Sequence, residues 1–229
     1  MEKINCDGKT SREINVEIRQ LIKQGTPKIQ VLSPLARHNL AVGLLEPVEL
    51  IFEGSVGYYC GGMIDGPQVT INGSAGWGLG ECMMNGTFIV NGNVGNSAAA
   101  SIRGGTMVVH GDAGARAGIA MKGGLLIVEG NCGTMAGFMM QKGTLIICGH
   151  SSDALADSMY EGTVYLGGEA RSLGNDTKVS EPDEPDQNFL KRTLLQYGIS
   201  ADRTFKKIVS GRRLWNFERQ EFEIWKEVL

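Results

Sequence analysis

The side chains that could do chemistry are few in this sequence, and they are not spaced for it. His38, His110 and His150 are the three histidines, and none has a neighbour at metal-ligand spacing, so we expect them to be structural or to face solvent. The five cysteines, at positions 6, 60, 82, 132 and 148, include no Cys-x-x-Cys pair. We therefore expect reduced thiols that pack as small apolar side chains. Their spacing excludes a zinc site, a disulfide framework and an iron–sulfur ligand set.

The carboxylates do not form a catalytic pattern either. Asp112 and Glu169 share one row of a repeat, whose other members are small or polar: Ser55, Ser74, Asn93, Asn131 and His150. A glycosidase needs two carboxylates at close range. This row contains no such close pair, so we expect it only to face solvent. The Gly-x-x-Gly turns lack the Lys-Ser/Thr of a phosphate-binding loop. The sequence predicts no catalytic, metal or cofactor residue on this chain.

The elements that carry these residues follow a repeat of 19 residues. The chain has 33 glycines in 229 residues, and one row of them is in phase throughout: Gly54, Gly73, Gly92, Gly111, Gly130, Gly149 and Gly168. A second row follows three residues later, and a third ends each unit at Gly86, Gly105, Gly124, Gly143 and Gly162. We expect the glycines to allow corners with positive φ and to leave room for the backbone of adjacent coils.

Each unit opens with a short run of β character. Its second and fourth positions are apolar, as in Met107 and Val109, which is the pattern of an inward strand face. One unit cannot bury that face alone, but stacked copies build a continuous core. A period of 19 residues is too short for helical repeat proteins. The units also lack the leucine pattern of leucine-rich repeats and the GGxGxD pattern of calcium-binding β-helices. The sequence therefore predicts an all-β core: a single-stranded right-handed parallel β-helix of about seven coils over residues 48–174.

The flanks predict a small α/β cap and a helical tail. In residues 1–47, Thr10 and Glu13 form a capping-box pattern that starts a helix within 9–26, and residues 28–32 have the pattern of a strand. In residues 175–229, an acidic, proline-stiffened linker at 181–186 precedes a helix at about 187–197 and then an aromatic tail.

Charge and hydropathy exclude some partners. The formal net charge is -3, and a nucleic-acid binder would usually show a basic excess. The chain contains no apolar run of the roughly 18–20 residues needed to span a bilayer, and its first residues lack a secretory-signal profile. We expect a cytoplasmic protein with neither nucleic acid nor membrane as a partner.

A stripe of apolar residues lies on the outside of the coils. The third strand position must point outward, yet it is mostly β-branched and apolar, and such patches mark contact surfaces. We predict a partner interface there, joined by two tyrosines that open the second half of the first coil: Ile51, Ile89, Val108, Ile127, Ile146, Tyr165, Tyr58 and Tyr59. The alternative, that the chain's own terminal segments cover the stripe, stays open.

Several segments resemble a known family. These are Gly54-Ser55-Val56-Gly57-Tyr58-Tyr59-Cys60-Gly61-Gly62-Met63, Asp153 to Leu155, Ser158 to Glu161, Ser172 to Gly174, and Ala201 to Trp215. They are similar to the GXGXG domain, which ends the large subunit of bacterial glutamate synthase and also forms the core of one subunit of formylmethanofuran dehydrogenase. The likeness is greatest to the free-standing β-helix subunit of N-methylglutamate synthase-type complexes.

This resemblance implies a non-catalytic scaffold subunit of a multi-subunit glutamate synthase-like complex. Its partners would be a class II glutamine-amidotransferase-type subunit and an FMN-binding subunit, which would hold FMN and an iron–sulfur cluster, with no cofactor on this chain. One alternative is the GXGXG-containing subunit of formylmethanofuran dehydrogenase. Others are a stand-alone β-helix enzyme acting on a polysaccharide or ester, and a self-assembling homo-oligomer.

Overall fold

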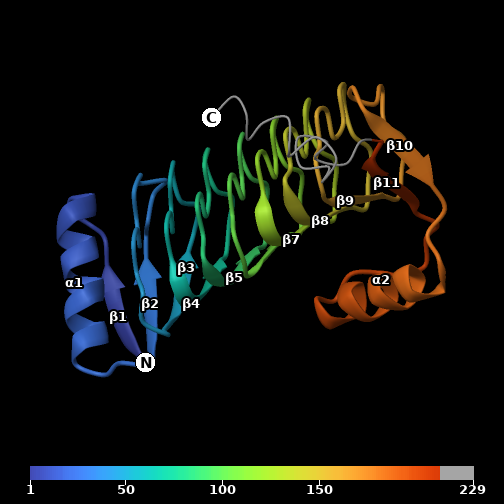
Figure 1. Ribbon diagram of the computed structural model, residues 1–229. Helices are drawn as coiled ribbons and strands as arrows, with labels where there is room; N and C mark the ends of the chain where they lie inside the picture. The colour runs from blue at the N-terminus through green and yellow to red at the C-terminus, as the bar shows by residue number, and fades with distance from the viewer. Residues whose placement is uncertain (212–229) are drawn as a thin grey trace, which may run out of the picture.

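The computed structural model describes residues 1–211 of the chain, and in this part eleven strands form one sheet. The order is β1-β2-β3-β4-β5-β6-β7-β8-β9-β11-β10, and all neighbours are parallel except those involving β11 (Figure 1). The strands that precede the regular coils are β1 (Glu2–Asn5) and β2 (Lys28–Leu32). The strands of the coils are β3 (Glu49–Glu53), β4 (Asp65–Ile71), β5 (Asn85–Val90), β6 (Thr106–Val109), β7 (Lys122–Val128), β8 (Lys142–Ile147) and β9 (Thr163–Leu166).

The 19-residue repeat becomes the register of the sheet. Met107 on β6 lies beside Phe88 on β5 and Leu126 on β7, so each residue meets its equivalents one period away. The second and fourth positions of every coil are buried in a single core, because stacking gives each apolar face a neighbour above and below. The predicted parallel β-solenoid is confirmed.

The other half of each coil is built from turns. It begins with one bridging residue per coil, for example Val94 between Ala75 and Ala113. Alternate residues then have positive φ, for example Ser97 and Ala99 at 60° and 57°. Left-handed backbone costs such residues about 1–2 kcal/mol each. Hydrogen bonds between coils offset this, since the Ser97 N–H donates to the Ala115 carbonyl at 2.8 Å.

The in-phase glycines do not need positive φ, contrary to our expectation. In their row only Gly54 has one, of 132°. The second expectation holds instead: a Cβ on Gly111 would lie 2.8 Å from the Gly92 carbonyl oxygen, and one on Gly130 would lie 2.7 Å from that of Gly111. Positive φ occurs instead at four of the five glycines that end the units, Gly86, Gly105, Gly124 and Gly143, for example Gly105 at 76°.

The row of small polar residues does more than face solvent, so that expectation was wrong. Each side chain from Ser55 to His150 accepts a hydrogen bond from the backbone N–H one coil further on. Asp112 Oδ1 accepts from the Asn131 N–H at 2.7 Å, and Asn131 Oδ1 accepts from the His150 N–H at 2.8 Å. The side chains from Ser55 to His150 therefore stabilise the corners that join successive coils.

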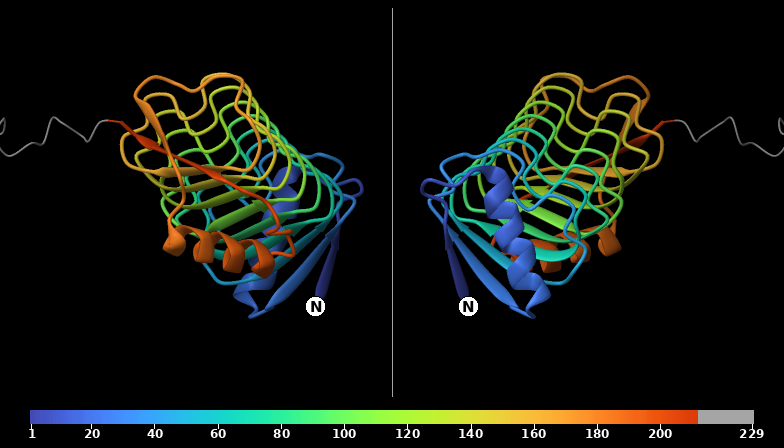
Figure 2. Two further views of the ribbon diagram at one scale, coloured as in Figure 1. Left: turned by 90° about the vertical axis from the view of Figure 1, so that its right-hand side faces the viewer. Right: turned by 90° about the vertical axis from the view of Figure 1, so that its left-hand side faces the viewer.

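At the N-terminal end, α1 (Ser11–Lys23) lies across the end of the coils (Figure 2). Its predicted capping box is present, with Thr10 and Glu13 bonded in both directions. The helix buries Ile14 and Ile18 in the main core, so it covers an edge that would otherwise be open.

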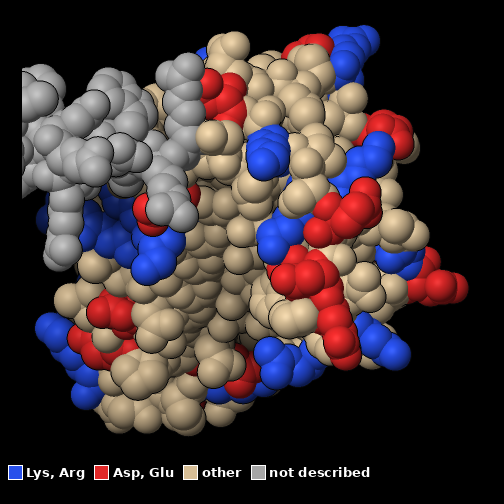
Figure 3. Space-filling model, turned by 45° about the vertical axis from the view of Figure 1, so that its right-hand side comes forward, with Lys and Arg blue, Asp and Glu red and all other residues tan. Residues whose placement is uncertain are grey.

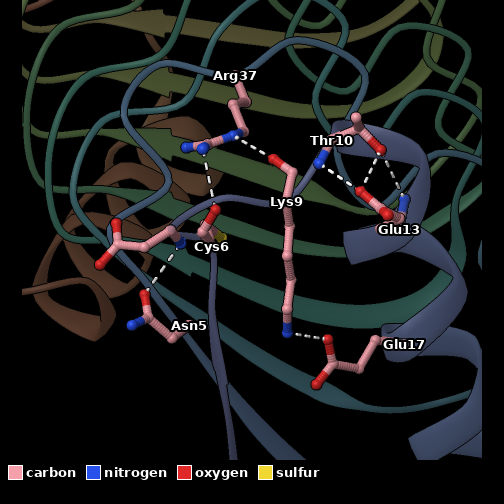
Figure 4. Close-up of polar contacts among 8 residues, drawn as sticks. Asn5, Cys6, Lys9, Thr10, Glu13, Glu17 and Arg37 are labelled. Carbon is pink, nitrogen blue, oxygen red and sulfur yellow. Dashed lines mark hydrogen bonds and ion pairs between the residues drawn. The ribbon is translucent and has the colours of Figure 1, made fainter.

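Residues 28–47 form a further coil that lacks the glycine signature. Its strand β2 pairs with β3, Ile29 lying beside Leu50 at a spacing of 21 rather than 19. The Arg37 guanidinium joins this coil to the chain before α1, donating to the Cys6 carbonyl at 2.9 Å and the Lys9 carbonyl at 3.2 Å (Figure 4).

The C-terminal flank departs from the prediction. The helix α2 (Glu184–Gln196) begins three residues early, because Asp183 caps it and Pro185 suits its first turn; the expected linker is partly helix. β10 (Thr177–Ser180) and β11 (Lys206–Ser210) were not predicted, and the rest of the predicted aromatic tail, residues 212–229, lies outside the described residues.

Candidate functional site: the outer surface of the coils

The predicted outward stripe is covered by the chain itself over the later coils. Val108, Ile127 and Ile146 are fully buried in a second apolar cluster, formed with Leu190 and Leu194 of α2. Figure 2 shows α2 lying under the strand face of these coils. The partner interface predicted there is therefore wrong for four residues of the stripe: Val108, Ile127, Ile146 and Tyr165.

A small polar network anchors α2 in this position. Asp186 belongs to the capping box of α2, accepts a hydrogen bond from the Tyr165 hydroxyl at 2.6 Å, and pairs with Lys207 Nζ at 2.6 Å. Partial burial raises the pKa of Asp186, but the hydrogen bonds from Lys207 and Tyr165 outweigh it and hold the pKa below its usual value. Burial, and then the Asp186 hydrogen bond, raise the pKa of Tyr165.

The first part of the stripe has less cover. Ile51 and Thr70 are half-buried, and Ile89 packs only partly against the α2 cluster. Ile51 and Ile89 therefore remain predicted partner contacts.

A second outer surface, on the turn side of the first two coils, is apolar and exposed. We call it the aromatic patch: Tyr58, Tyr59, Met63, Trp77 and Met84. Between 42 and 56% of each side chain is exposed, Met63 the most. Later coils carry small or polar residues at the places of Tyr58 and Trp77, such as Asn96, Ala115 and Thr134. The repeat alone therefore does not require these large side chains.

Part of the aromatic patch is preorganised by ring stacking. The rings of His38 and Tyr58 lie 4.5 Å apart at 14°, and those of Tyr58 and Trp77 lie 5.4 Å apart at 20°. His38 Nδ1 also accepts a hydrogen bond from the Tyr58 N–H at 2.9 Å. Rings held in this way lose little side-chain entropy when a partner binds.

A hollow lies beside the stacked rings. It has a volume of about 260 Å³ and is lined by these residues: Asn39, Val42, Tyr59, Gly62, Met63, Glu81 and Cys82. Methionine and aromatic linings adapt to apolar side chains of a partner. Tyr58 and Tyr59, predicted as partner contacts, lie on this surface, and their role stays a prediction.

The histidines and cysteines that could take part in catalysis are instead hydrogen-bonded within the fold or at least partly buried. His110 Nδ1 lies 2.7 Å from Glu129 Oε2, and His150 Nδ1 accepts from the Glu169 N–H at 3.0 Å. Burial raises the pKa of the Cys60 thiol to about 12 and that of Cys148 to about 11, so neither is a ready thiolate. Cys82 is half-buried.

Within residues 1–211, neither the charge pattern on the face drawn in Figure 3 nor metal-ligand geometry marks a functional site. On the face drawn in Figure 3, acidic and basic side chains are interspersed and form no field of one sign. Among residues 1–211, no group of three His, Cys, Asp or Glu side chains could hold a metal ion. No helix in the same range is long and apolar enough to cross a membrane.

Comparison with known proteins identifies a family that shares this glycine repeat. The chain is similar to protein GlxC of Rhizobium meliloti (strain 1021), with 44% identity over 57 residues. That match covers 24% of this chain and 25% of the relative. The family model of the GXGXG motif matches residues 9–183, which include all the regular coils. The chain therefore belongs to the GXGXG-motif family.

Proposed function

We propose that this chain is a non-catalytic scaffold subunit of a glutamate synthase-like complex, either an N-methylglutamate synthase or a split glutamate synthase. It would bridge a class II glutamine-amidotransferase-type subunit and an FMN-binding subunit, which would hold the flavin and an iron–sulfur cluster. The observation that carries the proposal is the aromatic patch: exposed, stacked rings on a rigid solenoid of the GXGXG family.

The architecture suits a spacer between two partners. Parallel strands bonded from coil to coil, with one polar row that joins the same corner of successive coils, make a stiff body along the repeat. Polar side chains of the types that enzymes use, such as Asp112 and His150, accept hydrogen bonds that join the coils. On the turn side of the first two coils the large exposed side chains Tyr58 and Trp77 stand where later coils have Asn96, Ala115 and Thr134, which supports a partner surface there.

Affinity purification from the native cell tests the assembly. The tagged full chain should bring down an amidotransferase-like chain and a chain with flavin absorbance and iron, identified by mass spectrometry. Tyr58→Asn with Trp77→Asn places on the first two coils the residue that the third has at position 96. This double variant should lower the recovery of one partner at least about tenfold, since buried aromatic side chains dominate interface energies.

A matched control separates this surface from exposed apolar area in general. Leu195→Asn removes a large side chain that is 59% exposed on α2, and it should leave recovery unchanged. Recovery of a molybdenum or tungsten pterin protein would instead support the subunit of formylmethanofuran dehydrogenase. Substrate turnover by the purified chain alone would overturn the scaffold assignment.

A further inference from the structure

A cavity at the base of α2 belongs to neither outer surface described above. It has a volume of about 420 Å³, within the range of roughly 300–1,000 Å³ typical of small-molecule sites. Three segments line it: residues 181–182 before α2, the first turns of α2 with Gln187 and Lys191, and residues 201 and 203–205 before β11. The cavity therefore lies where the covering helix joins the body of the protein.

The bottom of this cavity is apolar and fixed. Leu190 and Phe205 are 4% and 5% exposed and belong to the cluster that joins α2 to the stripe. Because both side chains already pack on the opposite side, a ligand above them would meet a preformed surface, and little reorganisation would oppose binding.

The rim carries two cations and one carboxylate. Lys191, Arg203 and Glu181 line the cavity and are exposed. Within the described residues Lys191 and Glu181 have no ion-pair partner, whereas the nearby Lys206 and Lys207 are paired with Glu169 and Asp186. Arg203 donates to the Cys148 carbonyl at 3.0 Å through Nη1, a neutral partner that leaves the charge of the guanidinium uncompensated.

We propose that this cavity binds a free α-amino dicarboxylate, a molecule with two carboxylates and one ammonium group on a short carbon chain. Lys191 and Arg203 would each pair with a carboxylate, Glu181 with the ammonium, and the carbon chain would lie on Leu190 and Phe205. The net charge of the ligand, -1, complements the charge of the rim. With exposed partners the dissociation constant is on the order of 1 mM.

The proposal goes beyond the proposed function and does not depend on it, because binding is measured on the isolated full chain. Calorimetric titration and saturation-transfer NMR with L-glutamate should detect binding. Glutarate, which lacks the ammonium, and L-glutamine, which lacks one carboxylate, should bind about tenfold more weakly, because each loses one charged contact with the rim.

Variants of the rim residues test which of them pairs with the carboxylates of the ligand and which with its ammonium group. Lys191→Gln should weaken L-glutamate binding about tenfold, and its exposed position leaves folding unchanged. Arg203→Gln should do the same, and Arg203→Lys should restore part of the affinity. Glu181→Gln should weaken L-glutamate binding but leave glutarate binding equal or slightly tighter, because the variant removes a like charge near the dianion. A purely structural role would not produce this opposite response.

A cation outside the cavity provides the control. Lys178 lies exposed on β10, and Lys178→Gln should bind L-glutamate as the wild type does. Absence of binding to wild-type protein at concentrations well above millimolar would overturn the proposal. Equal L-glutamate affinities of Lys191→Gln, Arg203→Gln and the wild type would overturn it too.

Discussion

The strand face of the later coils and the turn face of the first two coils follow one repeat but have opposite fates. On the strand face, Ile127 and Ile146 project outward and are buried by α2. On the turn face, Tyr58 and Trp77 project outward and stay about half exposed. In both regions the inward-facing side chains of the coils are buried in the same core. The repeat thus specifies the coil, while what lies against its outside depends on the rest of the molecule.

The covered face can be tested by placing a charge on it. Ile127→Lys should lower the free energy of unfolding by about 3–5 kcal/mol, because it places an uncompensated ammonium under α2. Ile51→Lys makes the same change in the same row, where the position is half-buried, and should cost about 1 kcal/mol or less. Urea unfolding followed by circular dichroism measures both. Equal losses would contradict self-covering by α2.

The framework shared by both regions can be tested at its glycines. Gly111→Ala should destabilise the fold by about 2–4 kcal/mol, because its Cβ would meet the Gly92 carbonyl oxygen, which cannot move without shifting a coil. A Cβ on Gly62 would have no atom nearer than 3.7 Å, so Gly62→Ala should be neutral or slightly stabilising. Thermal unfolding compares the pair, and an unchanged Gly111→Ala would refute the close-approach explanation.

The anchor of α2 should make the covered face sensitive to acid. The pKa of Asp186 is lowered in the folded state, so its stabilisation is complete above the unfolded pKa of roughly 3.9 and is lost as pH falls through the folded value. At pH 7, Asp186→Asn should cost about 1–3 kcal/mol.

The pH dependence of this difference is the decisive measurement. The gap in unfolding free energy between wild type and Asp186→Asn should narrow steadily below about pH 4. A gap that stays constant from neutral to acid pH would mean that the charge of Asp186 does not anchor the helix. Tyr165→Phe removes one donor while leaving Lys207 in place, and should give a smaller loss.

The aromatic patch should matter least for stability. Trp77→Asn should change the free energy of unfolding by less than about 1 kcal/mol, because the indole is about half exposed and loses mainly its stacking on Tyr58. Differential scanning calorimetry measures this. A loss of several kcal/mol would show that the stacked rings support the coils, and it would weaken their interpretation as a partner surface.

Local patterns predicted the elements that depend on local geometry. The 19-residue spacing predicts the strand register, because each coil must pair with its nearest equivalent, and Thr10 with Glu13 predicts the start of α1. The irregular coil at residues 28–47 was missed, since its spacing of 21 and its lack of the glycine row hide it. β11 was missed because it pairs antiparallel with β9, outside the repeat.

The 19-residue repeat was enough to predict the solenoid, its inward columns and an outward stripe of apolar residues. Which part of that stripe is covered follows instead from contacts between distant segments. It depends on where residues 184–205 return, as when Arg203 reaches the Cys148 carbonyl across 55 residues. Such contacts also explain why the in-phase residues are glycine: the constraint is the carbonyl of the neighbouring coil, which no single unit contains.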